Sequence, residues 1–129
     1  MIHIDTTLIR DLLAKAAGAD RKRANFDLRT SADDTSQRML NALLPGTIVP
    51  IHRHEDTTET VICLCGKLDE IVYTEHIAED GQVVYKECQR IRLSPLQGDY
   101  GCQVPKGAWH TVEVLEPSVI FEAKDGAYK

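Results

Sequence analysis

From residue 37 onward, the sequence consists of short stretches of β-type residues separated by turn-forming residues. The stretches are residues 37–44, 60–65, 68–74, 83–93, 101–104, 111–115 and 119–123. Between some of them stand Pro45-Gly46, Gly66 and Asp80-Gly81, and the last pair indicates a hairpin because both residues tolerate a positive φ angle. Many short strands of this kind are typical of a β-sandwich or a β-barrel. We therefore expect an all-β fold over residues 37–124.

One helix is expected ahead of the β-rich part, over residues 5–18. Asp5 or Thr6 can cap its N-terminus, and Gly18 is placed to end it. Its apolar residues recur every three or four positions, as in an amphipathic helix: Leu8, Ile9, Leu12, Leu13, Ala16 and Ala17. Residues 19–36 are charged and polar without a sustained period, so we expect an irregular connection there. With 129 residues, the chain 1–129 fits a single domain.

The composition argues against several classes of partner. The net charge is −5, whereas nucleic acids and anionic membranes attract clustered lysines and arginines, so neither is expected to bind. No apolar run approaches the ~18 residues that a membrane span requires, and no secretory signal is present, so we expect a cytoplasmic protein. The cysteines form no Cys-x2-Cys pair and are expected to be buried small apolar residues: Cys63, Cys65, Cys88 and Cys102.

The stretch GTIVPIHRHEDTTETVICLCG, residues 46–66, contains three possible metal ligands close together. His52 and His54 leave the same face of an extended segment, about 6 to 7 Å apart along it, and two such imidazoles can hold one ion. A turn at residues 56–58 would bring Glu59 alongside them. A third histidine must come from a distant strand, and His110 of PKGAWH follows a tight turn before a β-type run. Histidines are also common on polar surfaces, but the joint spacing of all four residues favours a metal site.

The spacing of these residues resembles the two sequence motifs of the cupin superfamily. The first motif is matched from Gly46 to Gly66, and the second is matched in part by PKGAWH, which ends at His110. Val114 stands where cupins usually carry an asparagine four residues after that histidine. The resemblance implies a β-barrel of the jelly-roll type with a divalent metal inside it. Its ligands would be His52, His54, Glu59 and His110.

Two longer segments are similar to the WbuC-type cupin-fold metalloproteins, a family found with bacterial surface-polysaccharide genes. The segments are QRMLNALLPGTIVPIHRH and VPKGAWHTVEVLEPSVIFEAKDGAY, together with the leading helix. This similarity implies an enzyme of polysaccharide biosynthesis that acts on a small sugar or nucleotide-sugar derivative, as an isomerase or epimerase. Two alternatives stay open, an iron-dependent dioxygenase and a non-catalytic metal-dependent sensor or small-molecule-binding module.

The ligand set limits the choice of metal without naming one. Three imidazoles and one carboxylate suit Fe(II), Mn(II), Zn(II), Ni(II) or Co(II) better than Cu(I) or Ca(II). If the ion is six-coordinate, four protein ligands leave two positions for water, dioxygen or a small-molecule ligand. That arrangement is typical of a catalytic site, whereas a structural site is closed.

Arg38 and Tyr73 are the expected catalytic residues outside the ligand set. Arg38 is favoured for an anionic substrate group because a guanidinium forks onto carboxylate or phosphate. Asn41 has the opposite strand parity, so a regular strand would send only one of these two inward. Trp109 should point away from the metal and is expected to pack or to lie in an interface. Because small cupins pair their exposed edges, the resemblance also implies a homodimer, with the N-terminal helix and Trp109 as candidate interface elements.

Overall fold

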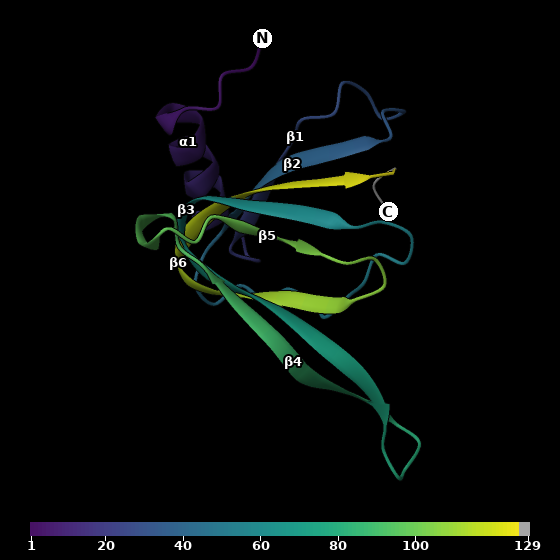
Figure 1. Cartoon of the computed structure of the whole chain (residues 1–129). Helices are drawn as coiled ribbons and strands as arrows, with labels where there is room; N and C mark the ends of the chain where they lie inside the picture. Colours follow the sequence, from purple (N-terminus) through teal and green to yellow (C-terminus); the bar gives the residue numbers. More distant parts are fainter. Residues whose placement is uncertain (127–129) are drawn as a thin grey trace.

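The computed structural model describes residues 1–126, which form a twisted antiparallel sheet with one helix against it (Figure 1). The elements are α1 (Thr6–Ala17), β1 (Arg23–Asp27), β2 (Ser36–Leu43), β3 (Glu59–Ile77), β4 (Val83–Leu93), a 3-10 turn (Pro95–Gln97), β5 (Gly101–Val104) and β6 (Trp109–Asp125). The strand order is β1-β2-β6-β3-β4, and β5 pairs with the start of β3. The predicted all-β class with one short helix is confirmed.

Helix α1 is held at both ends by polar contacts and packs on the sheet through one apolar stripe. The Asp5 side chain accepts a hydrogen bond from the Leu8 amide at 3.0 Å, which caps the N-terminus. Gly18 ends the helix, and its N–H donates to the Ala14 carbonyl at 3.2 Å. The stripe is buried in a cluster with β2 and β6: Leu12, Ala16, Leu40, Ala42 and Val119. The helix therefore covers the sheet face that points away from the interior of the barrel.

Residues 19–36 are not wholly irregular, because β1 lies within them. This strand pairs with β2 in the register from Arg23↔Leu43 to Asp27↔Met39. Its sequence, RANFD, has no clean alternation that would indicate a strand. The expectation of an irregular connection was wrong here because the open edge of β2 supplies the backbone partners, and strand propensity depends strongly on such context.

Strands β3 and β6 are long and bent, so each serves two parts of the barrel. The residue pairs 59–63 of β3 lie against 120–124 of β6, and 68–73 of β3 lie against 109–114 of β6. Between these parts the register shifts, and Gly66 adopts φ +93°. A Cβ at Gly66 would overlap the Pro117 carbonyl oxygen and the Ser118 hydroxyl, so only glycine fits. The sequence stretches 60–65 and 68–74 are thus one strand, as are 111–115 and 119–123.

A second apolar cluster fills the space between the bent strands. It contains Leu43, Val61, Cys63, Leu68, Leu93, Val114 and Ile120. Val114, which replaces the asparagine usual in cupins, is 8% exposed and packs in this cluster, so the departure from the motif adds to the core. Within residues 1–126, no helix has the length and apolar character needed to cross a membrane.

Candidate metal centre

Three histidines converge at one end of the barrel interior. Their candidate ligand atoms all lie within 4.8 Å of one another: His52, His54 and His110. His52 and His110 are paired through their backbones, because each amide donates to the other's carbonyl, at 3.0 and 2.8 Å. This isolated bridge joins the segment before β3 to the start of β6, and it explains why two residues 58 positions apart in sequence meet.

Two of the imidazoles are oriented by backbone carbonyls so that Nε2 carries the lone pair. Nδ1 of His52 lies 2.8 Å from the Pro50 carbonyl oxygen, and Nδ1 of His110 lies 3.0 Å from the Ala108 carbonyl oxygen. A hydrogen bond to a carbonyl requires the proton on Nδ1 and leaves Nε2 as the acceptor. Nε2 of His110 is buried and has no hydrogen-bond partner among the described residues. Because buried polar atoms are almost always paired, this lone pair is suited to a metal ion.

Glu59, the first residue of β3, brings a carboxylate to the same cluster. Its Oε2 lies 3.0 Å from Nε2 of His54, and its Oε1 lies 4.0 Å from Nε2 of His110. Burial raises the pKa of Glu59 to about 8, and the nearby Glu122 carboxyl adds to the rise while Lys124 opposes it. The carboxyl therefore keeps its proton near neutral pH until an ion or another positive charge approaches.

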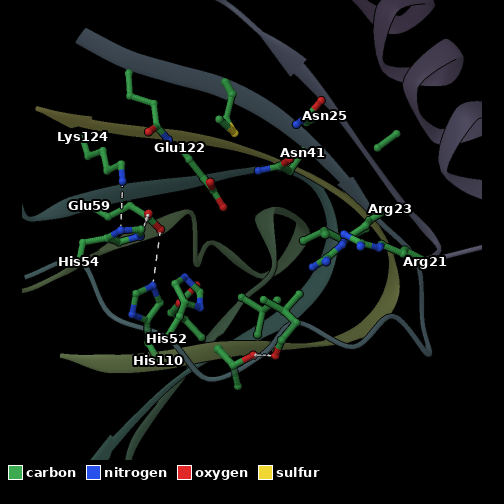
Figure 2. Close-up of a pocket in the computed structure, with 18 residues that line it drawn as sticks. Arg21, Arg23, Asn25, Asn41, His52, His54, Glu59, His110, Glu122 and Lys124 are labelled. Atoms are coloured by element: carbon green, nitrogen blue, oxygen red, sulfur yellow. Dashed lines mark hydrogen bonds and ion pairs between the residues drawn. The ribbon is translucent and has the colours of Figure 1, made fainter. Parts of the chain in front are cut away.

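His54 is shared between Glu59 and a buried lysine. Nζ of Lys124 lies 3.0 Å from Nδ1 of His54 (Figure 2). Since an ammonium can only donate, this contact places the proton of a neutral His54 on Nε2, which faces Glu59. Burial lowers the pKa of His54 and of His110 to about 4, and Lys124 adds to the effect at His54. Both imidazoles are thus uncharged near neutral pH, the state in which they bind metals.

The cluster forms one end of a cavity of about 470 Å³ inside the barrel. The cavity wall away from the histidines carries Glu122 and Asn41, and Arg21 and Arg23 lie at the opposite end (Figure 2). Glu70 of β3 also lines it and is 4% exposed. Burial raises the pKa of Glu70 to about 9, and burial also raises that of Glu122. A hydrogen bond from Asn41 partly offsets the rise at Glu122.

The structure brings together the four residues that sequence spacing selects as metal ligands and separates the two expected catalytic residues from them. Arg38 has the parity opposite to the cavity-lining residues of β2, and its Nη1 donates to Asp34 Oδ2 at 3.1 Å and to the Ser36 carbonyl. Tyr73 lies on the part of β3 that pairs with Trp109 and does not line the cavity. Neither residue lines the cavity that contains the histidines.

Trp109 lies next to His110 in sequence and faces the other way, as strand alternation predicts. Its ring is 5.0 Å from that of Tyr85, between centroids, and the Arg53 guanidinium carbon lies 4.6 Å from its ring centroid. These contacts make it a packing residue on the outside of the metal-binding end.

Several cavity residues were missed by sequence reasoning: Arg21, Arg23, Gln37, Glu70 and Glu122. Strand parity could have indicated Gln37, because it lies on the same face of its strand as Asn41. No local pattern indicated Glu70, which comes to the cavity only because β3 bends at Gly66.

The bent β3 and β6 strands, with the histidine cluster inside the sheet that they form, give the chain a cupin fold, which its structural neighbours share. The chain belongs to a family described as a domain of unknown function (DUF6016), whose model matches residues 4–87. That description assigns no activity. No protein of the curated sequence collection matches the chain.

Solved structures show the same fold at low sequence identity. KdgF from Halomonas sp. superposes with a TM-score of 0.60 and 16% identity, over 82% of each chain. A conserved protein of unknown function from Streptococcus pyogenes, SPY1581, superposes with a TM-score of 0.61 and 11% identity, over 86% of this chain and 80% of that one. The capsular polysaccharide assembling protein CapF from Staphylococcus aureus gives a TM-score of 0.55 and 17% identity, over 86% of this chain but only 30% of CapF. At such identities the likeness concerns the fold alone.

Proposed function

We propose that this protein is a metal-dependent enzyme that isomerises or epimerises a small sugar or nucleotide-sugar derivative. The metal ligands would be His52, His54, Glu59 and His110. The observation that carries the proposal is the buried Nε2 of His110, which has no hydrogen-bond partner within residues 1–126 and lies in a cluster with two more imidazoles and a carboxylate. A divalent transition metal such as Fe, Mn, Zn, Ni or Co bound here would supply a Lewis acid that polarises a substrate oxygen.

Glu70 and Glu122 are the proposed proton-transfer residues of this reaction. Isomerisation next to a carbonyl removes a proton from carbon and returns one to a neighbouring atom, which requires an acid and a base beside the substrate. Glu70 has no hydrogen-bond or ion-pair partner within residues 1–126, and its raised pKa keeps it protonated at neutral pH. Glu122 lines the same cavity and accepts a hydrogen bond from Asn41; in its ionised form it would take the proton from carbon, and protonated Glu70 would donate one to the carbonyl oxygen. Arg38 and Tyr73 have no part in this scheme.

The character of the cavity favours this chemistry over oxygen chemistry. A dioxygenase requires redox-active iron beside an apolar pocket for dioxygen. Here charged and amide side chains line much of the cavity, among them Gln37, Asn41, Glu70 and Glu122. Such groups are suited to the hydroxyls of a sugar, because each hydroxyl both donates and accepts hydrogen bonds. One neighbour of the same fold is a ribosomal oxygenase, YcfD from Escherichia coli, so the iron-dependent alternative is kept as an outcome of the tests.

The first test is the metal content of protein purified without a chelator. We expect about one divalent ion per chain, and a loss of an order of magnitude or more in the His52→Ala and His110→Ala variants while the fold is retained. His76→Ala is the matched control, because His76 is exposed and its ring nitrogen hydrogen-bonds to the Thr74 hydroxyl, away from the histidine cluster. Unchanged metal content in both cluster variants would refute the ligand assignment.

The second test is proton exchange with solvent. Aldose and ketose phosphates incubated with metal-loaded protein in D₂O should gain deuterium at the carbon next to the carbonyl, and Glu70→Gln should slow this gain at least tenfold. Oxygen consumption by an iron-loaded sample would support the dioxygenase alternative instead. Ligand binding without exchange or oxygen consumption would leave a non-catalytic binding or sensor module.

The setting in polysaccharide biosynthesis rests on sequence resemblance. The segment QRMLNALLPGTIVPIHRH supports membership of the WbuC type, and a neighbour of the same fold is described as a capsular polysaccharide assembling protein. We also propose a homodimer formed along the outer edge of β4, because that strand is nearly all exposed. Exposed apolar residues of β4 include Val83 and Ile91, at 50% and 38% exposure, and an open edge with apolar side chains favours pairing.

A further inference from the structure

We infer that Arg21 and Arg23 form an anion-binding subsite at the end of the cavity opposite the histidines. The substrate would then carry a phosphate or carboxylate at some distance from the oxygen that reaches the metal centre. The existence of this subsite is independent of the metal, whereas its meaning for the substrate rests on the function proposed above.

The two arginines occupy the cavity because of the backbone between them. Lys22 adopts φ 57°, a left-handed conformation that is uncommon for a residue with a side chain. Its amide donates to the Ala19 carbonyl at 3.0 Å, and its carbonyl accepts from the Leu44 amide at 3.0 Å. The kink is therefore fixed on both sides, and Arg21 and Arg23 both line the cavity (Figure 2).

A second set of contacts ties this segment to the turn after β2. The Thr47 hydroxyl donates to the Arg21 carbonyl at 2.6 Å. The Lys22 side chain does not line the cavity and instead lies over Gly46. Arg23 begins β1 and pairs with Leu43 in the sheet. The backbone that carries both guanidinium groups is thus anchored before any ligand arrives, which lowers the entropic cost of binding.

Neither guanidinium has a hydrogen-bond or ion-pair partner within residues 1–126. Five other arginines are paired with carboxylates of their own chain: Arg29, Arg38, Arg53, Arg90 and Arg92. The chain has 20 acidic against 15 basic residues, so potential partners are not scarce. None of the cavity carboxyls is within ion-pair distance of Arg21 or Arg23. The pair is therefore available to an external anion, and planar guanidinium groups match phosphate and carboxylate oxygens.

The sheet register sets the length of a ligand that would touch both ends. Glu59 lies across from Lys124, and Lys124 lies across from Gln37 at one end of β2. Arg23 lies across from Leu43 at the other end. Six residues of strand separate these two rows, roughly 20 Å between backbones. Even with long side chains reaching inward, a ligand that spans both ends must exceed a single sugar ring, as a sugar phosphate or a nucleotide sugar does.

Gln37 provides a further sign that the cavity is built for a polar ligand. Its side chain is 3% exposed and lines the cavity, and its Oε1 has no hydrogen-bond partner among the described residues. A buried amide oxygen without a partner costs free energy unless a ligand or water supplies a donor. A sugar hydroxyl is such a donor, and Asn41 offers a second amide on the same strand face.

The test uses full-length protein without metal. A chelator removes the metal and is then dialysed away, so that a probe anion cannot bind to a metal ion in the cavity. Inorganic pyrophosphate and malonate serve as probes, because they separate phosphate from carboxylate recognition. Binding of each probe is measured by calorimetry for every variant, and in the unsubstituted protein the NMR signals of the Arg21 and Arg23 Nε–H groups are followed as well. We expect saturable shifts with at least one probe, and a loss of affinity of at least tenfold in the double variant Arg21→Gln/Arg23→Gln.

Lys22→Gln is the control for charge on this segment, since it removes one positive charge outside the cavity, whereas the double variant removes two from its lining. It should bind the probe within about twofold of the unsubstituted protein if position, not bulk charge, is responsible. Equal binding by the double variant and the control, or no saturable shift with either probe, would overturn the inference. Metal content separates the two claims. If the protein binds the anion through the two arginines but takes up no metal, only the proposed function is refuted. If it takes up metal but binds the anion equally well without the arginines, only this inference is refuted.

Discussion

The affinity for a divalent metal should fall about tenfold for each pH unit below about 8, because one ligand must first lose a proton. In the metal-free protein, burial raises the pKa of Glu59 to about 8, and the Glu122 carboxyl adds to the rise. Glu59 can bind an ion only as the carboxylate. Well below its pKa, each pH unit therefore costs a factor of ten, or roughly 1.4 kcal/mol. Half of the carboxyls are still protonated at pH 8, so the loss from pH 8 to pH 6 is about 50-fold.

Titration of the histidines would give a different profile. Burial lowers the pKa of His54 and of His110 to about 4, so both are already neutral between pH 6 and 8 and release no proton on binding. If they titrated near the usual value of about 6.5, the affinity would be level above pH 7 and fall steeply below 6.5. The pH dependence of the affinity expected from Glu59 differs most from that expected from the histidines between pH 6.5 and 7.5.

The assay is competition for Zn(II) with a chromophoric chelator at several pH values in buffers that do not bind metals. Calorimetry in two buffers of different ionisation enthalpy counts the protons released, which we expect to be roughly one per ion at pH 6.5. Glu59→Gln is the control. It has no proton to release, so its affinity should be lower at pH 8 and independent of pH down to 6.5. A level affinity between pH 6.5 and 7.5 in the unsubstituted protein would refute the reasoning.

Three further predictions concern stability and assembly. Gly66→Ala should lower the free energy of unfolding by more than about 3 kcal/mol in denaturant titration, because the new Cβ meets the backbone of the facing strand. Gly81 also has a positive φ, +85°, but open space around it, so Gly81→Ala should lower the free energy of unfolding by only about 1 kcal/mol. Glu70 has a folded-state pKa near 9 against 4.5 in the unfolded chain, so its contribution to stability is complete below about 4.5 and is lost as the pH rises through about 9. The metal-free protein should thus lose up to roughly 1.4 kcal/mol per pH unit from this group, and Glu70→Gln should remove that part of the slope; an unchanged slope would count against a buried, protonated carboxyl. Equilibrium sedimentation at micromolar concentration should give a dimer, and Val83→Glu on the β4 edge should shift it to monomer; a monomeric unsubstituted protein would rule the dimer out.

Much of the fold could be read from local patterns. The helix cap at Asp5 and the hairpin at residues 80–81 each depend on a few neighbouring residues, and both occur in the structure. The bends of β3 and β6 could not be predicted in the same way, because a strand interrupted by a bulge looks in sequence like two strands and a turn. Strand β1 was also missed, since its pairing partner, not its own sequence, makes it a strand.

The candidate site shows the same division. The spacing of His52, His54 and Glu59 in the sequence predicted that they lie close together. The structure places these three residues together with His110. The sequence could not decide between Arg38 and Asn41, because parity says that two residues face opposite ways and does not say which of them faces inward. Asn41 lines the cavity, and Arg38 pairs with Asp34 outside it.

The sequence by itself determined the class of fold and selected the residues that are proposed as metal ligands, because both are expressed in residue types and in spacings of a few positions. Only the tertiary structure decided which faces turn inward, and hence that Glu70, Glu122, Arg21 and Arg23 share a cavity with the histidines. It alone also decided that carboxyls there hold their protons and imidazoles do not. Burial is the physical reason, since the loss of solvent around a group is imposed by strands far apart in the chain and leaves no mark on the local sequence.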